Sequence, residues 1–240
     1  MSLSKPTTSS NPATKFIQFK KGKWVYYDKV AEEELELSTP FFFAILDQLH
    51  TVKGWSDQHQ SSIYSNEIKN FNEKLHVRSF KGYIDIIGFY HDIKGEITIA
   101  GGRYCKSVYA MLFDKEGHRE LVNFQLTGSS FGAFLEADIK DQTQVVEVTG
   151  ETIPKKKGAT EYVVPVFKKY KMSDEILKDG IEMDEVLQGY LDSYKNKDES
   201  VKVEQEALAQ EADVKRDAVI DKLAEEWVEE DDPAETQLPF

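Results

Sequence analysis

Runs of alternating apolar and polar residues, rich in aromatic and β-branched side chains, recur along most of this chain and predict a mainly β protein. Glycine, proline or polar turn residues separate the runs, which cover residues 24–27, 34–37, 41–49, 75–80, 103–113, 121–126, 145–149 and 161–170. The third run could also form a short helix, because a short apolar run fits either structure.

Two segments interrupt the strand pattern. Residues 84–93 could form a short helix, and residues 129–139 begin with serines that can cap a helix and continue with apolar residues at helical spacing. A helix after several strands and before the last two predicts an OB-fold. This fold is a small β-barrel of five strands, with one helix between the third and the fourth.

The pattern changes again after Met172, where Ser173 and Asp174 can cap an amphipathic helix. Its apolar stripe contains Ile176, Leu177, Ile181, Val186, Leu187 and Tyr190. We therefore expect a C-terminal helix over residues 173–197, packed against an OB-fold domain of residues 15–172. The Ser- and Pro-rich residues 1–14 and the acidic residues 198–240 predict a disordered arm and a flexible tail.

Charge is distributed unevenly along the chain. The whole sequence has 30 Lys and Arg against 43 Asp and Glu, a net charge of -13. Residues 198–240 contain 15 acidic and four basic residues, whereas residues 1–172 contain 23 basic and 21 acidic ones. The low overall isoelectric point therefore does not argue against a body that binds an anion.

The residue types that carry catalysis or bind metals show no recognisable spacing. A single cysteine, Cys105, and five scattered histidines predict neither a disulfide nor a zinc site, and we expect no cofactor. The carboxylates of Asp85, Asp92 and Glu96 leave a metal-dependent nuclease open as an alternative, but we expect a protein that is not an enzyme. Without an apolar segment that could cross a membrane or direct secretion, a cytoplasmic location is expected.

Aromatic residues alternate with lysine and arginine in several of the predicted strands. Single-stranded nucleic acid is bound by this combination, because cations neutralise phosphates and aromatic faces stack on bases. The candidate DNA-binding residues are Arg78, Phe80, Lys81, Tyr83, Arg103, Tyr104, Lys106, Tyr109 and Lys168. Any one of these aromatic residues could instead belong to the core. Lys155, Lys156 and Lys157 precede Gly158 and predict a basic hairpin loop that could close over a bound strand.

Four segments carry a resemblance to a known family. They are Ser65–Glu67, Val77–Ser79, Gly101–Tyr109 and the Leu126–Gly128 run that leads into an aromatic-bearing helix. Together they resemble the single-stranded DNA-binding proteins of tailed bacteriophages, over roughly Phe41–Phe134. The resemblance implies an OB-fold protein that coats and protects single strands during phage DNA replication, recombination and repair, in the cytoplasm of the host bacterium.

The last residues of the sequence carry a second resemblance. Asp231 and Asp232 precede Leu238, Pro239 and Phe240, which is similar to the acidic tail of bacterial single-stranded DNA-binding proteins. The resemblance implies a tip that docks in partner enzymes such as a polymerase, a helicase or primase, or a recombinase. An acidic tail that serves only solubility is the alternative for this segment. An annealing or recombination accessory factor is the alternative function, and the protein could also form homo-oligomers.

Overall fold

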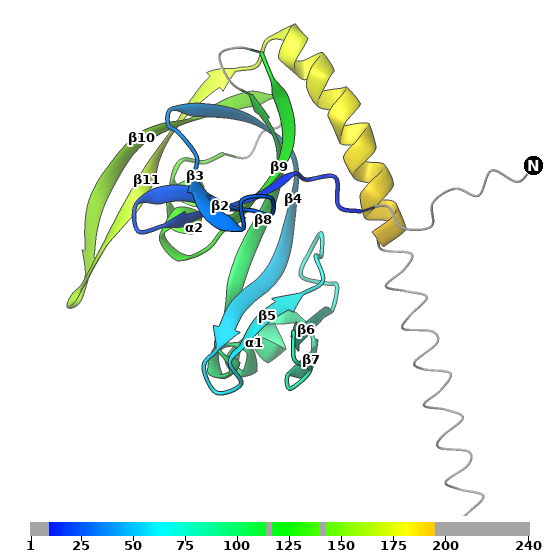
Figure 1. Ribbon diagram of the computed structural model, residues 1–240, viewed down its shortest axis with the longest axis vertical. Coiled ribbons are helices and arrows are strands. Elements are labelled where there is room, and N and C mark those ends of the chain that lie inside the picture. The colour runs from blue at the N-terminus through cyan, green and yellow to red at the C-terminus, as the bar shows by residue number, and fades with distance from the viewer. Residues whose placement is uncertain (1–9, 114–116, 140–142, 195–240) are drawn as a thin grey trace, which may run out of the picture. The chain divides into compact units, whose positions relative to one another are not determined.

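The computed structural model describes residues 10–113, 117–139 and 143–194 (Figure 1). Eleven strands of this part form one mixed sheet, accompanied by three helices. The prediction of a mainly β protein is therefore confirmed. No helix among the described residues has the length and apolar character needed to span a membrane.

The elements follow one another along the chain as the alternating patterns require. They are β1 Lys15–Lys20, β2 Lys23–Asp28, β3 Glu33–Glu36, β4 Phe41–Ser56, β5 Ser61–Ser65, β6 Leu75–Ser79, β7 Asp85–Gly88, α1 Tyr90–Ala100, β8 Gly102–Phe113, β9 Arg119–Leu126, α2 Gly128–Glu136, β10 Gln144–Lys157 and β11 Thr160–Lys171. A further helix begins at residue 174 and continues to residue 194, the last one described.

Two long strands, β4 and β8, organise the sheet. They pair antiparallel from Phe42 opposite Phe113 to Gly54 opposite Gly102. The strand order is β3-β2-β1-β9-β8-β4-β5-β6-β7, and β10 pairs with both β4 and β11. Because β4 pairs with β10 near its start and with β5 near its end, it belongs to both halves of the sheet.

The sheet stays open, which corrects the prediction of a closed five-stranded barrel. Closure would require the last strand, β11, to pair with β9, but β11 pairs only with β10 among the described strands. The free edge of β9 is covered instead by β1, which runs parallel to it with Lys15 opposite Val122. This choice of edge partner depends on segments more than 100 residues apart, so no local pattern predicts it.

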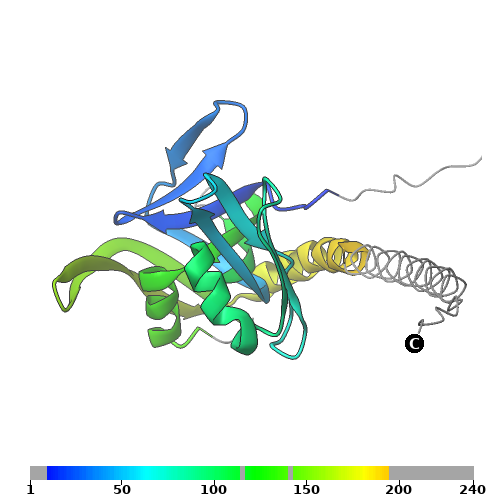
Figure 2. The same ribbon diagram turned by 90° about the horizontal axis from the view of Figure 1, so that it is seen from below.

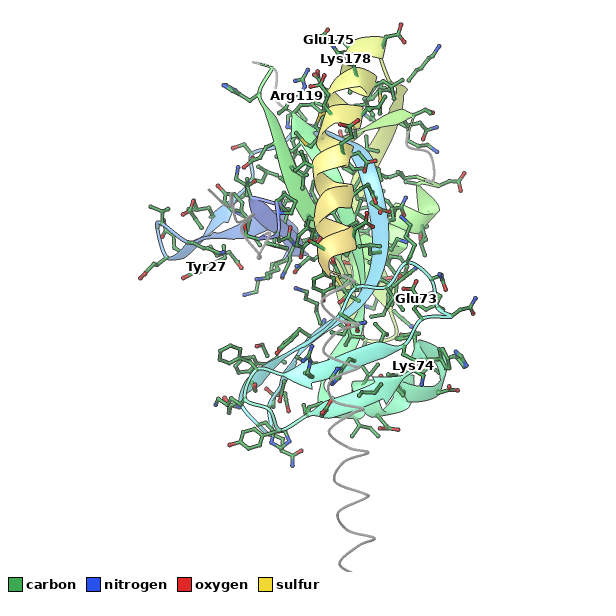
Figure 3. All side chains as sticks on the ribbon, turned by 90° about the vertical axis from the view of Figure 1, so that its right-hand side faces the viewer. Tyr27, Glu73, Lys74, Arg119, Glu175 and Lys178 are labelled. Carbon is green, nitrogen blue, oxygen red and sulfur yellow. The ribbon has the colours of Figure 1, made fainter. Side chains whose placement is uncertain are left out.

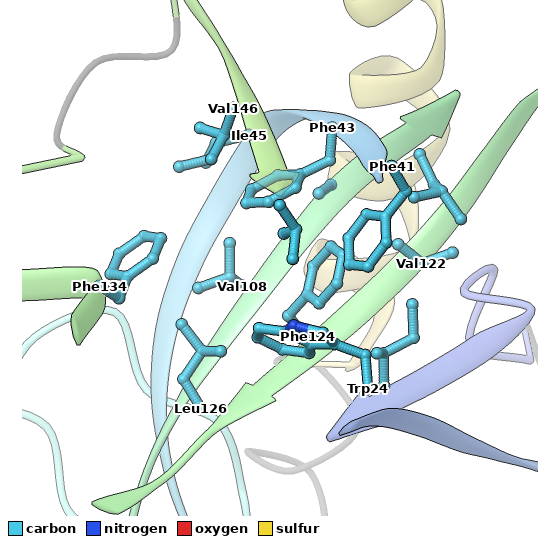
Figure 4. Close-up of a cluster of buried hydrophobic side chains, with 14 of the residues drawn as sticks. Trp24, Phe41, Phe43, Ile45, Val108, Val122, Phe124, Leu126, Phe134 and Val146 are labelled. Atoms are coloured by element: carbon cyan, nitrogen blue, oxygen red, sulfur yellow. The ribbon is translucent and has the colours of Figure 1, made fainter. Parts of the chain in front are cut away.

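The main core lies on one face of β4, β8 and β9 (Figure 4). Phe43 and Phe124 contact each other there with ring centroids 4.7 Å apart, and Trp24 from β2 packs edge-on against Phe124 at 5.8 Å. A second, smaller core joins Val52 of β4 to strands β5 and β6 and to Ile97 of α1. Each core buries the apolar half of an alternating strand pattern.

Figure 2 shows the β1–β3 meander, drawn in blue, at the top of the view and the helices α1 and α2, drawn in green, below it. The predicted helix over residues 84–93 is wrong in its first half. Asp85–Gly88 forms β7, with Ile86 opposite Val77 of β6, and helix α1 begins only at Tyr90. The alternative that residues 41–49 form a helix is also wrong, because they belong to β4.

The predicted C-terminal helix is confirmed for residues 174–194. It begins beside Ser173, whose carbonyl oxygen accepts a hydrogen bond from the Leu177 backbone at 3.0 Å. Arg119 of β9 lies beside this helix and donates from Nε to Asp179 at 3.0 Å (Figure 3). Residues 195–240, which include the predicted acidic tail, lie outside the described part of the chain.

The predicted disordered arm over residues 1–14 is wrong for its last residues. Asn11 donates from Nδ2 to the Tyr109 hydroxyl at 2.9 Å, and the Thr14 backbone donates to the Leu121 carbonyl at 2.9 Å. Residues 10–14 are therefore fixed against β8 and β9, although their composition is that of a flexible segment.

Candidate nucleic-acid interface

A groove of about 590 Å³ crosses the sheet on the face opposite the main core. Strand β1 forms one wall with Gln18 and Lys20, while β4, β5 and β8 supply residues that include Lys53, Tyr64 and Arg103. We call this concavity the basic groove. No acidic residue lines it within the described part of the chain.

Strand pairing places three cations and one aromatic ring in a row that starts in the groove and ends at Arg78 of β6, beside it. Lys53 of β4 lies opposite Arg103 of β8 on one side and opposite Tyr64 of β5 on the other. Tyr64 in turn lies opposite Arg78 of β6. Directly opposed residues project to the same face of a sheet, so four neighbouring strands present a continuous line of three cations and one ring.

Trp55 lies two residues beyond Lys53 on the same face of β4, and its side chain is 50% exposed. The Arg78 guanidinium stands over the Tyr64 ring at 6.0 Å, and the Lys53 ammonium stands over the Phe16 ring at 5.9 Å. Such cation–ring contacts hold a charge beside an aromatic face without neutralising it. The groove therefore offers ring faces and free positive charge together.

The cations of the row remain available to an anion. Among the described residues no carboxylate forms an ion pair with Lys53, Arg78 or Arg103. The Arg78 Nε is buried and has no hydrogen-bond partner there. A buried donor without an acceptor is costly, so Arg78 carries an unsatisfied donor beside Tyr64.

The turn between β6 and β7 carries three more of the predicted residues. The Phe80 backbone donates to the carbonyl of Ser62 at 2.9 Å, and Ser62 lines the groove. Phe80 is 80% exposed, and the adjacent Lys81 is also exposed. Tyr83 stacks on His59 with ring centroids 5.1 Å apart. These side chains lie beside the groove rather than inside it.

Tyr104 and Lys106 project to the other face of β8 because side chains alternate along a strand. There they line a second concavity of about 840 Å³. His50 of β4, Phe71 from the loop between β5 and β6, and Phe131 of α2 line it as well. We call this concavity the aromatic pocket. Arg103 therefore lines the basic groove, whereas Tyr104, its neighbour in the sequence, lines only the aromatic pocket.

Tyr109 is not available for base stacking, which corrects its assignment as a DNA contact. Its side chain is 0% exposed, and its hydroxyl donates to Glu67 Oε2 at 2.8 Å. Ser107 donates to Oε1 of the same carboxyl group at 2.5 Å. Burial raises the pKa of Glu67, an effect that these two hydrogen bonds oppose. Tyr109 therefore holds β8 against the loop that contains Glu67.

The predicted basic loop belongs to the hairpin of β10 and β11, and its residues line neither concavity. Lys155 contacts both carboxylate oxygens of Glu136, at 2.7 and 2.8 Å, and Lys156 pairs with Glu161 at 3.3 Å. Lys157 and Lys168 are exposed on the same hairpin. The structure therefore does not bring these lysines together with the basic groove.

The groove residues that the sequence did not predict include Lys53, Trp55 and Tyr64, as well as Gln18 and Lys20 of β1. The predicted strand ended at residue 49, whereas β4 continues to Ser56 through Lys53 and Gly54, which break its apolar pattern. The same interleaving of cations and rings that marked residues 103–109 is present in residues 53–55. That signal could have identified Lys53 and Trp55.

The remaining candidate groups are the thiol of Cys105 and the carboxylates that left a nuclease open. Burial raises the pKa of the Cys105 thiol to about 12, which leaves it un-ionised at neutral pH. Asp85 lies on β7, and Asp92 and Glu96 lie on α1. In the described ranges, no three His, Cys, Asp or Glu side chains are grouped so that they could hold a metal ion.

The predicted docking tip, Asp231, Asp232, Leu238, Pro239 and Phe240, lies outside the described residues. Comparisons with known proteins identify no family for this chain. No family model, no curated protein and no solved structure matches this chain.

Proposed function

We propose that this protein binds single-stranded DNA in the basic groove and coats it without catalysing a reaction. One observation carries the proposal: the cross-strand row of Arg103, Lys53, Tyr64 and Arg78, with Trp55 beside it. Cations that track a phosphate backbone and rings on which bases stack are the two requirements of sequence-tolerant single-strand binding.

A duplex fits this arrangement poorly. Bases of a duplex are stacked on one another and paired, so their faces cannot reach Trp55 or Tyr64. Only a strand with unstacked bases can use the rings and the cations of the groove at once. We therefore expect a strong preference for single strands and little preference among sequences.

The strand connections support an OB-type arrangement within the larger sheet. Strands β4, β8 and β9 are consecutive antiparallel neighbours, α2 follows β9, and β10 returns to pair with β4 and with β11. An OB-fold has one helix between its third and fourth strands and binds oligonucleotides on the face of its second and third. In this arrangement β8 and β9 would be those two strands, and Arg103 and Gln125 from them line the basic groove.

The biological setting that we propose follows from the resemblance to phage single-stranded DNA-binding proteins. The protein would protect strands exposed during phage DNA replication, recombination and repair. The acidic segment that ends in Leu238, Pro239 and Phe240 would recruit replication or recombination enzymes, with its charge steering the encounter.

An anisotropy titration tests the proposal. The full chain is added to a fluorescently labelled oligo-dT and, separately, to the same label on a duplex. Tight binding to oligo-dT that weakens as salt rises, with much weaker binding to the duplex, is the expected result. Equal affinity for both, or no binding, would reject the proposed function.

A further inference from the structure

The aromatic pocket differs from the basic groove in its chemistry. Its rings enclose Tyr104: Phe131 of α2 lies 5.0 Å from Tyr104, Tyr90 of α1 lies 5.6 Å away, and Phe71 lies 6.1 Å away, measured between ring centroids. Its volume of about 840 Å³ lies within the usual range for sites that hold a small organic group. The pocket is therefore large and aromatic enough to enclose a planar ring.

Polar groups occupy one part of this pocket. The His50 Nδ1 and the Tyr104 hydroxyl form a hydrogen bond of 2.6 Å. Burial, assisted by the nearby Lys106, lowers the pKa of His50 to about 4, so the imidazole is neutral at physiological pH. Lys106 lies opposite His50 on β8 and has no ion-pair partner within the described ranges. The pocket thus combines uncharged rings with two cations, Lys106 and Arg103, that have no ion-pair partner among the described residues.

The two concavities meet around an uncovered edge of β8. The last residue of β8 that pairs with β9 is Lys106, opposite Leu126, so Arg103 lies beyond the end of that pairing. Arg103 lines both concavities, Thr127 lines the groove, and the next residue, Gly128, lines the pocket. A strand that leaves the groove at Arg103 can therefore pass this edge and enter the pocket.

We propose that the aromatic pocket binds an unstacked base of the same DNA strand that occupies the basic groove, with the intervening phosphates held between Arg103 and Lys106. This inference rests on the proposed function. Continuity at Arg103 and complementary charge support a nucleic acid as the occupant. The DNA would then wrap around the edge of β8 and contact both faces of the sheet, so the binding site would be longer than the groove alone.

Photocrosslinking tests the path of the strand. Single thymines of a long oligo-dT are replaced in turn by 5-iodouracil, the complex with the full chain is irradiated, and the crosslinked residues are identified by mass spectrometry. The proposal expects crosslinks to Trp55 or Tyr64 from some positions and to Phe71, Tyr104 or Phe131 from others. Crosslinks confined to the groove would overturn it while leaving the proposed function intact.

A substitution supplies the second test. Phe71 is 41% exposed, so Phe71→Ala removes a pocket ring with little loss of buried core. Its affinity for long oligo-dT should fall by about fivefold to a hundredfold, the worth of one stacked base. The matched control is Tyr27→Ala, which removes a 60% exposed ring that lines neither concavity.

The urea unfolding midpoints of both variants are also measured. A loss of affinity is attributed to the missing ring only if the variant unfolds at the same midpoint as the wild type. Unchanged affinity in Phe71→Ala, with Tyr27→Ala also unchanged, would overturn the pocket's role. If the wild-type chain binds no oligonucleotide at all, the proposed function fails first, and that outcome is distinguishable from a strand that occupies the groove alone.

Discussion

Gly54 and Gly101 lie so close together that a Cβ atom on Gly54 would stand 2.3 Å from the carbonyl oxygen of Gly101. In the opposite direction, a Cβ on Gly101 would stand 2.3 Å from the Trp55 carbonyl oxygen, and Gly101 has a φ of +96° that favours glycine. Here the end of α1 and the start of β8 meet β4. The positions of Trp55 and Arg103, which flank this contact, therefore depend on the absence of a Cβ atom at Gly54 and Gly101.

Substitution of Gly54 should destabilise the protein. A methyl group in Gly54→Ala would meet backbone atoms that cannot move independently, so the free energy of unfolding should fall by about 1–3 kcal/mol, as for other overpacked sites. The control is Gly95→Ala in the exposed part of α1, where a Cβ would meet nothing within 4 Å. That change should be neutral or stabilising by up to about 1 kcal/mol. Urea unfolding of both variants measures this difference in stability. Equal unfolding midpoints would show that the methyl group of Gly54→Ala meets no close contact.

Removal of a groove ring should weaken DNA binding without affecting stability. Tyr64 is 39% exposed and lies between Lys53 and Arg78, so Tyr64→Ala removes one stacking face. The loss should be about 1–3 kcal/mol of binding free energy, which is roughly five- to more than a hundredfold in affinity. Anisotropy with oligo-dT measures it, with Tyr27→Ala as the control. A Tyr64→Ala variant that binds as tightly as Tyr27→Ala would remove Tyr64 from the interface.

Neutralising one groove cation should change the salt dependence of binding. For single strands the slope of log affinity against log salt is about -0.7 per phosphate contact, so Lys53→Gln should make it shallower by about 0.7. Lys23→Gln removes the same charge from a lysine that pairs with Glu36 at 2.5 Å on the β2–β3 hairpin. Its slope should match that of the wild type. Identical slopes for both variants would indicate that Lys53 contacts no phosphate.

His50 should contribute a pH dependence to stability. Its pKa is about 4 in the folded protein, mainly because of burial, against an ordinary value of 6.5. Between these values the unfolded chain binds a proton that the folded protein does not, so the His50 contribution is complete above pH 6.5 and is lost as the pH falls toward 4. In His50→Gln, stability should therefore fall less steeply over this range. Urea unfolding at several pH values checks this, and curves parallel to the wild type would refute it.

Most strands of this fold could be predicted from the sequence because their signal is local. Alternation alone predicts the segment that becomes β8, and it also predicts that Arg103 and Tyr104 point to opposite faces. The open edge of the sheet could not be predicted, because the parallel pairing of β1 with β9 joins residues more than 100 positions apart. Edge partners are chosen by the whole fold rather than by local propensity.

The candidate site was predictable only in part for the same reason. Arg78 and Arg103 stand out in the sequence as cations beside aromatic residues, but Tyr64 and Lys53 come between them only through strand pairing. Tyr109 has the residue type of a stacking platform, yet a hydrogen bond to Glu67, 42 residues away, fixes it in the interior. Residue type identifies candidates, and burial decides among them.

The most direct measurement is the tryptophan fluorescence of the full chain as oligo-dT is added. The sequence has three tryptophans, so the measurement uses a chain in which Trp227, outside the described residues, is replaced by Phe. Trp24 is only 3% exposed whereas Trp55 is 50% exposed in the groove, so a base stacked on Trp55 should quench part of the remaining emission. Oligo-dT should cause saturable quenching that salt reverses, that duplex DNA does not produce, and that Trp55→Phe loses. Oligo-dT that binds without quenching, or quenches Trp55→Phe equally, would contradict the groove as the DNA-binding site.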